Sequence, residues 1–267
     1  MMPHMPTPLL SLSAGTVLDC PVRDLADVAA TAGFGAFGVR LFDDTTLDDL
    51  HALRRRAVDL GLSILDLEVV RIQPDRYSTD IGRMIEAGAI LGASWLLTTC
   101  EDPDLQRGAE RLAALADRAR PHGLRVAFEA MAFTAVHTVD EALVFSAGVP
   151  DAGVIVDVLH HQRAGQSPAQ LAAIDRSRIC YVQLCDAPSM APSDIEALAH
   201  EARTARLAPG EGELPLAEML AALDLHDVPF AIEVQQVERA RTDSPTVRAA
   251  HYFNATRALL QNLGFAA

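Results

Sequence analysis

The stretch Leu124-Arg125-Val126-Ala127-Phe128-Glu129-Ala130-Met131 is an apolar run that ends in a carboxylate. It follows a segment with helical spacing, and a short apolar run in that position predicts a buried parallel strand. A carboxylate at the end of such a strand is costly to bury unless a cation or a hydrogen-bond donor meets it. The stretch therefore predicts a parallel α/β fold with a polar site where the strand ends.

The same pattern recurs three times further along the chain. The other runs are Val154-Ile155-Val156-Asp157, Tyr181-Val182-Gln183 and Ala231-Ile232-Glu233. Each is a short apolar run that ends in a polar side chain. One such residue is weak evidence, whereas four in successive strands predict a shared site.

Short apolar runs alternate with helical segments along the whole chain. Strands are predicted over residues 9–13, 36–41, 62–68, 94–98, 124–129, 153–157, 179–184 and 229–234. Helices are predicted over residues 21–32, 46–60, 79–91, 104–119, 139–147, 168–174, 215–223 and 245–263. Eight strand–helix units in 267 residues favour a (β/α)8 barrel over an open sheet, with residues 1–267 as a single domain.

The longest connection runs from about residue 187 to residue 214. Residues 193–203 within it have helical spacing and begin with a capping signature. A connection of this length is typically a lid or a binding element. We expect a lid-like insertion that carries Arg203 and Arg206 toward the mouth of the barrel.

The composition excludes several classes of function. The chain has a net charge of −14, and all 22 basic residues are arginine. The acidic balance argues against nucleic-acid and membrane partners, and the lack of lysine excludes a Schiff base through a lysine amine. The G-x-G-x-x-G letters at Gly33–Gly38 precede a predicted strand instead of following one, which argues against a dinucleotide site.

The predicted compartment is the cytoplasm. The first six residues lack the basic start and apolar core of a signal peptide, and no apolar run approaches membrane-spanning length. The four cysteines have no C-x-x-C spacing, which indicates buried free thiols in a reducing compartment. The sequence leaves the oligomeric state open, a homo-oligomer included.

In a (β/α)8 barrel the active site is built at the C-terminal ends of the strands. Glu129, Asp157, Gln183 and Glu233 end four neighbouring predicted strands, so their side chains can converge. Together they carry a formal charge of −3, and a divalent cation would relieve the repulsion between them. An all-oxygen set suits Mn²⁺ or Mg²⁺, with Co²⁺ and Zn²⁺ as less favoured options. The alternative is that each side chain is paired with an arginine or with backbone N–H groups.

The segments around these four residues resemble a known family. Phe128-Glu129, Val156-Asp157-Val158-Leu159-His160, Val182-Gln183-Leu184-Cys185-Asp186 and Ile232-Glu233-Val234 are similar to motifs of the xylose-isomerase-like, sugar phosphate isomerase/epimerase superfamily. The resemblance covers nearly the whole chain. It implies a divalent metal held by the four residues above, catalytic proton transfer by Glu129 and Glu233, and substrate contact by His160.

One branch of the superfamily is closer at the third metal position. Many members place histidine there, whereas this chain has Gln183, followed by Asp186-Ala187-Pro188. That combination resembles the 3-dehydroshikimate dehydratase branch, in which the D-x-x-H histidine, here His160, is implicated in proton transfer. The segment Gln235–Arg239 departs from that branch.

The chemistry also follows from the residue types. A metal bound to a carbonyl and an adjacent hydroxyl stabilises an enediolate, and a carboxylate or imidazole takes the α-proton. Reprotonation then gives epimerisation or isomerisation, whereas loss of a β-hydroxyl gives dehydration. We expect an isomerase or epimerase of a small polyhydroxylated keto sugar or cyclitol. The alternative is a dehydratase-type lyase.

Two other classes of function are less favoured. A nucleic-acid repair enzyme of the same superfamily would need a histidine-rich zinc cluster and a basic face, which this chain lacks. A non-catalytic binding barrel need not keep four strand-end polar residues.

Further residues are candidates for substrate contact. Glu68 and Arg71 follow the predicted strand 62–68, where they would bind substrate hydroxyls or a carboxylate, or pair with each other in a salt bridge. Arg40 has the same two interpretations, and Arg206 is placed among the substrate-binding residues. Of two adjacent histidines, His160 is favoured over His161 to face the pocket.

Overall fold

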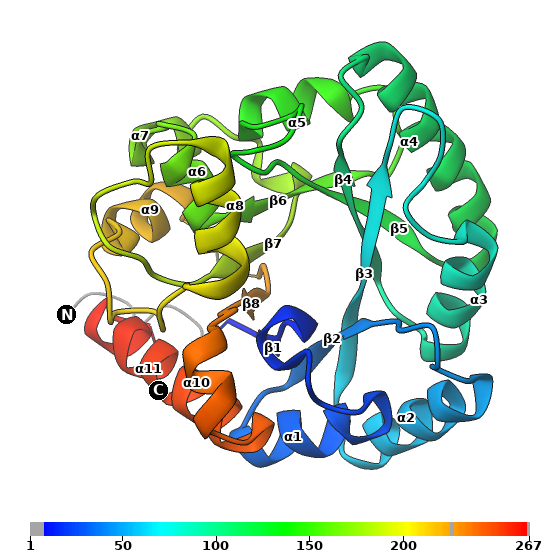
Figure 1. Ribbon diagram of the computed structural model, residues 1–267, viewed down its shortest axis with the longest axis horizontal. Coiled ribbons are helices and arrows are strands. Elements are labelled where there is room, and N and C mark those ends of the chain that lie inside the picture. Colours follow the sequence, from blue (N-terminus) through cyan, green and yellow to red (C-terminus); the bar gives the residue numbers. More distant parts are fainter. Residues whose placement is uncertain (1–7, 225–226, 266–267) are drawn as a thin grey trace.

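The predicted barrel is confirmed. The computed structural model describes residues 8–224 and 227–265, and in it eight parallel strands close in chain order, with β1 next to β8 (Figure 1). The strands are β1 (Leu10–Leu12), β2 (Ala36–Arg40), β3 (Ser63–Ile72), β4 (Trp95–Cys100), β5 (Arg125–Glu129), β6 (Gly153–Asp157), β7 (Ile179–Leu184) and β8 (Phe230–Ile232). Because parallel strands in a closed barrel all point the same way, their C-terminal ends form one rim.

Helices surround the barrel on the outside (Figure 1). They are α1 (Leu25–Ala32), α2 (Leu47–Asp59), α3 (Ile81–Leu91), α4 (Leu105–Ala119), α5 (Val139–Phe145), α6 (Val158–Arg163), α7 (Pro168–Leu171), α8 (Ile195–Thr204), α9 (Leu216–Leu223), α10 (Val237–Thr242) and α11 (Pro245–Asn262). Local signals explain several of the boundaries. Thr46 and Asp49 form a capping box at the start of α2, and α1 ends at Gly33 in the left-handed region.

The core has two layers. A large cluster of apolar side chains fills the space between the strands and the helices. A smaller cluster lies inside the barrel, and its largest members are Trp95, Ile155 and Tyr181. The four cysteines are buried and unpaired, as predicted. A packed interior closes the barrel beneath its rim, so that polar chemistry is confined to the mouth.

Two short helices near the mouth were not predicted. Helix α6 begins directly after β6, and α10 follows β8; each has six residues. Six residues are less than two helical turns, too few to show an apolar period in the sequence. The start of α6 matters for function because Asp157 caps it and His160 lies in its first turn.

The prediction that Glu68 and Arg71 follow the third strand was wrong. Strand β3 continues to Ile72, so both residues lie within it. The extension is stabilised by pairing of Ile72 with Cys100 of β4 and by a bridge to Tyr77. The sequence alone gave no reason to extend the strand, because its pairing with β4 depends on residues distant in the chain.

The long connection after β7 contains the predicted helix, α8, which packs against α6. Its two ends are tied to the barrel. The Asp186 carboxylate accepts hydrogen bonds from the backbone N–H groups of Ala187, Gly210 and Leu214. A bidentate ion pair joins Arg163 of α6 to Glu201 of α8, with N–O distances of 2.7 and 2.8 Å. Helix α8 is therefore fixed against the mouth.

Candidate metal centre and active site

The structure brings the four predicted ligands together at the mouth of the barrel. Glu129 ends β5 and Asp157 ends β6, where it lies directly opposite Gln183 of β7. Glu233 follows the last residue of β8. All four are at most 5 % exposed, so each oxygen must find its partners inside the site.

Several of these oxygens lack a partner. Gln183 Oε1 and Glu233 Oε2 are buried and accept no hydrogen bond from the described residues. Glu129 pairs with no arginine in the described part of the chain, and His160 Nε2 lies 3.9 Å from its Oε1. Space around Glu233 depends on a glycine, since a Cβ at Gly15 would lie 2.6 Å from Glu233 Oε1. Unpartnered buried oxygens in an acidic cluster are the feature expected of a site that binds a cation.

Arg206 lies among the predicted ligands. Its Nη1 donates to Asp157 Oδ2 at 2.7 Å, and its Nη2 lies 3.4 Å from Glu233 Oε2. Its Nε donates to the carbonyl of Ala202 in α8 at 2.8 Å. The side chain is 3 % exposed. Arg206 was predicted to bind substrate, and in the structure its guanidinium contacts two carboxylates, those of Asp157 and Glu233.

The electrostatics of the cluster divide its carboxylates. Burial raises the pKa of Glu129 well above its usual value, and the neighbouring Glu233 and Asp157 add to the effect. Burial likewise raises the pKa of Glu233, although Arg206 opposes it. Burial acts in the same direction on Asp157, but Arg206 and His160 outweigh it and hold the pKa of that carboxyl below its usual value. Of the three carboxylates, Glu129 has the least of its negative charge compensated by a neighbouring cation.

The two adjacent histidines point to different surroundings. The backbone N–H of His160 donates to Asp157 Oδ1 at 3.0 Å, and its ring packs edge-on against Phe133 with the centroids 5.2 Å apart. Burial lowers the pKa of His160 to about 4, so its imidazole is neutral at pH 7. His161 Nε2 lies 3.0 Å from the carbonyl of Ser167, away from the mouth. His160 therefore faces the cavity and His161 packs behind it.

A cavity of about 320 Å³ opens onto the cluster. Its wall includes Glu129, His160 and Glu233 on the acidic side. The arginines on its wall are Arg40, Arg71, Arg203 and Arg206. Phe133 also lines it. The mouth thus combines a carboxylate-rich floor with an arginine-rich wall.

Glu68 does not line this cavity. Its Oε1 accepts hydrogen bonds from the Ser13 hydroxyl at 3.2 Å and from the Ala14 N–H at 2.9 Å, and its Oε2 pairs with Arg40. Arg71 pairs instead with Glu101, at 3.6 Å. The expected alternative of a Glu68–Arg71 salt bridge was therefore wrong, because each partner lies closer to another charged group.

A buried pair inside the barrel was missed at the sequence level. The Tyr181 hydroxyl donates to Asp66 Oδ2, and both residues are at most 3 % exposed. Burial, with the nearby Glu68, raises the pKa of Asp66 to about 8. A Cβ at Gly38 would lie 2.3 Å from Asp66 Oδ1. The only available signal was a lone aspartate within an apolar strand, which does not reveal a partner on the far side of the barrel.

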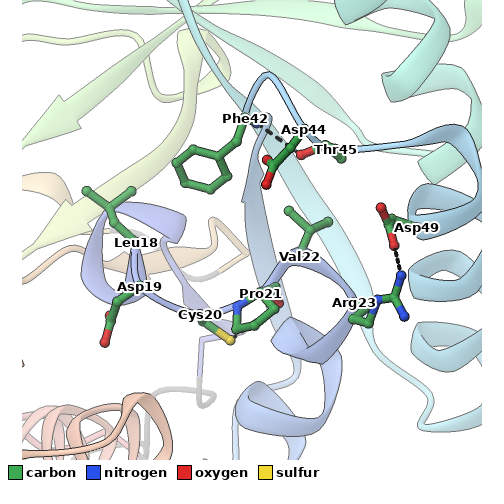
Figure 2. A pocket seen from close by; sticks show the side chains of 10 residues that line it. All are labelled: Leu18, Asp19, Cys20, Pro21, Val22, Arg23, Phe42, Asp44, Thr45 and Asp49. Atoms are coloured by element: carbon green, nitrogen blue, oxygen red, sulfur yellow. Dashed lines mark hydrogen bonds and ion pairs between the residues drawn. The ribbon is translucent and has the colours of Figure 1, made fainter.

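A second cavity, of about 470 Å³, lies between the loops that follow β1 and β2 (Figure 2). Its wall includes Leu18, which also lines the first cavity, and Phe42. Arg23 and Asp49 on its edge pair with each other, and Asp19 pairs with Arg248 of α11. Arg23, Asp49 and Asp19 are thus already paired, and the remaining charged residue of the wall, Asp44, does not by itself make a convergent set of reactive side chains.

The donor set at the mouth fits a divalent metal. Three carboxylates and one amide oxygen form an all-oxygen set, which suits hard cations such as Mg²⁺ and Mn²⁺. Gln183 Oε1 and Glu233 Oε2 accept no hydrogen bond from the described residues, although Arg206 Nη2 lies 3.4 Å from Glu233 Oε2, so both oxygens have lone pairs for coordination. Oxygens of Glu129 and Asp157 and a ring nitrogen of His160 also lie within 4.8 Å of one another. The metal and its ligands remain expectations for this chain.

Known proteins are similar to this chain in sequence. A 3-dehydroshikimate dehydratase from Pseudomonas aeruginosa is 31% identical over 215 residues, which cover 73% of this chain and 33% of that protein. The chain thus spans about a third of the length of that curated relative. In the described residues no helix is long and apolar enough to cross a membrane.

Solved structures agree in fold. The IolI protein with a bound zinc atom superposes with a TM-score of 0.80 at 19% identity, covering 97% of this chain and 99% of that one. D-psicose 3-epimerase superposes with a TM-score of 0.72 at 14% identity, covering 96% and 99%. The family model for the xylose isomerase-like TIM barrel matches residues 26–252. The chain belongs to the xylose isomerase-like TIM barrel family.

Proposed function

We propose that this chain is a divalent-metal-dependent enzyme that removes a proton next to a carbonyl of a small polyhydroxylated substrate. The observation that carries the proposal is the acidic cluster beside a cavity, in which Gln183 Oε1 and Glu233 Oε2 are buried and accept no hydrogen bond from the described residues. Glu129, Asp157, Gln183 and Glu233 would hold the metal, with Mn²⁺ or Mg²⁺ expected. When bound, a divalent ion acts as a Lewis acid toward the substrate carbonyl.

The residues on the cavity wall supply the proton transfer. In the metal-free protein, burial among other carboxylates raises the pKa of Glu129, and no arginine pairs with it among the described residues, so we assign it as the general base. His160 Nε2 lies 3.9 Å from Glu129 Oε1, so the two groups can exchange a proton with the same part of the substrate. We assign Glu129 and His160 to the substrate face next to β5 and β6, and Glu233 to the face next to β8.

The arginines that line the cavity favour an anionic substrate. Arg203 makes no ion pair among the described residues and stacks 5.2 Å from the Phe133 ring, while Arg71 has only a long pair with Glu101. A guanidinium binds a carboxylate through two parallel hydrogen bonds. We therefore rank dehydration of a carboxylate-bearing hydroxy ketone first. 3-Dehydroshikimate, which the sequence relative is named for, has this chemistry.

Dehydration needs no additional reagent. The base takes the proton next to the carbonyl, the β-hydroxyl departs with a proton as water, and a new C=C bond forms. From 3-dehydroshikimate, loss of one water followed by enolisation gives an aromatic dihydroxybenzoate.

Epimerisation or isomerisation of a keto sugar is the second candidate. It is favoured by the placement of two glutamates, Glu129 after β5 and Glu233 after β8, on separate parts of the rim. Two carboxylates that approach a substrate from different sides can remove a proton from one face and return one to the other. The same proposed metal ligands would serve dehydration and epimerisation alike.

One assay separates the two candidates. The Mn²⁺-loaded protein is incubated in D₂O with 3-dehydroshikimate and, separately, with a panel of keto sugars. Ultraviolet absorbance of an aromatic product supports the dehydratase, whereas deuterium at one sugar carbon supports the epimerase. Arg203→Gln and Arg71→Gln should raise KM for the anionic substrate about tenfold, the order expected for loss of one charged hydrogen bond. Failure of Mn²⁺, Mg²⁺ and Co²⁺ alike to raise the melting temperature would remove the metal centre from the proposal.

A further inference from the structure

We infer that Arg206 is a built-in cation of the metal centre, which limits the affinity of the site for divalent metal and stabilises the metal-free protein. The inference rests on the metal centre proposed above and assigns to Arg206 a positioning and charge-balancing role toward it.

Contacts from all three guanidinium nitrogens hold Arg206 within the cluster. Its Nε is held by the carbonyl of Ala202, and its Nη1 by Asp157 Oδ2 with Cys185 Sγ 3.4 Å away. Its Nη2 faces Glu233 Oε2 at 3.4 Å without the alignment of a hydrogen bond. With the side chain 3 % exposed, the guanidinium is largely shielded from solvent.

The charges then balance for one divalent ion. Because metal ligands bind in the deprotonated form, Glu129, Asp157 and Glu233 contribute −3 to the metal-bound site, and Gln183 and a neutral His160 imidazole contribute none. Arg206 reduces the sum to −2, which a divalent ion brings to zero. The arginine compensates only one side of the cluster, since it contacts Asp157 and Glu233 and leaves Glu129 and Gln183 without a cation. The unpartnered side is where the metal has least competition.

Two opposite effects follow from one positive charge. In the metal-free protein, Arg206 relieves the repulsion between buried carboxylates, so its removal should lower the melting temperature. In the metal-bound protein, the guanidinium and the metal repel each other, so its removal should tighten metal binding by about tenfold or more. If Arg206 only supported the local structure, its removal would lower both the melting temperature and the affinity for metal, because Asp157 and Glu233 would lose their positions.

The experiment uses the full chain stripped of metal with a chelator. Binding of Mn²⁺ is measured by calorimetry, and melting is measured with and without saturating Mn²⁺, for the wild type and Arg206→Gln. We expect Arg206→Gln to melt at a lower temperature without metal, to bind Mn²⁺ about tenfold more tightly, and to show the larger rise in melting temperature on adding Mn²⁺. Equal or weaker Mn²⁺ binding by the folded variant overturns the inference.

Two further variants keep the test decisive. Arg206→Lys retains the charge and should keep the Mn²⁺ affinity within about threefold, which is less than 1 kcal/mol. This variant is used if Arg206→Gln does not fold without metal. A tenfold change in the Mn²⁺ affinity of Arg206→Lys counts against the charge-balancing role. Arg203→Gln is the matched control on the same segment, because Arg203 lies over Phe133 and not on a carboxylate; its Mn²⁺ affinity should equal that of the wild type. Absence of Mn²⁺ binding by the wild type contradicts the metal centre itself, which is distinct from failure of the Arg206 inference.

Discussion

Two buried glutamates at the mouth of the barrel have opposite surroundings. Glu68 on β3 is 2 % exposed and Glu129 on β5 is 5 % exposed, so burial does not distinguish them. Glu68 is met by Arg40, by the Ser13 hydroxyl and by the Ala14 N–H. Glu129 is met by no arginine in the described residues, and its neighbours are other carboxylates and a neutral histidine. The supply of partners, and not burial, separates a structural carboxylate from a candidate metal ligand.

The contrast extends to the two sides of the mouth. On the β2–β4 side, arginines and carboxylates pair with each other, as Arg40 does with Glu68 and Arg71 with Glu101. On the β5–β8 side, one arginine, Arg206, contacts Asp157 and Glu233, and Glu129 pairs with no arginine among the described residues. The first side is charge-balanced by the chain itself. The second side is balanced only when a further cation is present, which is why the proposed function places the metal there.

The largest expected effect is on catalysis. Glu129→Gln should lower turnover about a thousandfold, the order of loss for a general base, while the fold is retained because the amide removes a repelling charge. Turnover and circular dichroism are measured on the metal-loaded protein. Glu68→Gln is the matched control, and it should lose far less turnover. Equal losses in the two variants would contradict the distinction between the two glutamates.

A smaller effect is expected on metal binding. Gln183→Ala removes a neutral ligand whose Oε1 has no other partner among the described residues. Its Mn²⁺ affinity should fall between about 10-fold and 100-fold, a range typical of changes around a metal site, with little change in the melting temperature of the metal-free protein. Calorimetric titration measures the affinity. Unchanged affinity would show that Gln183 is not a ligand.

The paired glutamate should reveal itself through stability. Glu68→Gln leaves Arg40 without its ion pair, and the free energy of unfolding should fall by about 2 kcal/mol, the order of a hydrogen bond to a charged group. Glu129→Gln should not lower the stability of the metal-free protein. Urea unfolding in the presence of a chelator compares the two. A larger loss of stability in the Glu129 variant would reverse the assignment.

The smallest effect is a change in pH dependence. The pKa of Asp66 is raised to about 8 by burial and by Glu68, so the folded protein keeps a proton that the unfolded chain loses near pH 4. Stability from this group is present at low pH and is lost as pH rises toward 8, with a slope of at most about 1.4 kcal/mol per pH unit. Asp66→Asn removes the contribution of this group to the slope and retains an acceptor for Tyr181. Urea unfolding of the metal-free protein between pH 5 and 7.5 measures it, and identical slopes in the two proteins would contradict the shift.

The sequence by itself determined the barrel and the placement of four polar residues on its rim. Apolar runs followed by helices recur eight times, and the hydrophobic period needs only local information. The residues Glu129, Asp157, Gln183 and Glu233 were found because each stands at the end of such a run. Strand ends in a parallel barrel must share one rim, so their convergence at the mouth followed from the fold class alone.

Only the tertiary structure decided how the charges pair. Glu68 lies 28 residues from Arg40, Arg206 lies 49 residues from Asp157, and Asp66 lies 115 residues from Tyr181. No local pattern encodes such pairs, because the register of distant strands and the path of the connection after β7 bring them together. An ion pair acts over a few ångströms, so the role of each carboxylate was settled by which cation the folded chain delivers to it.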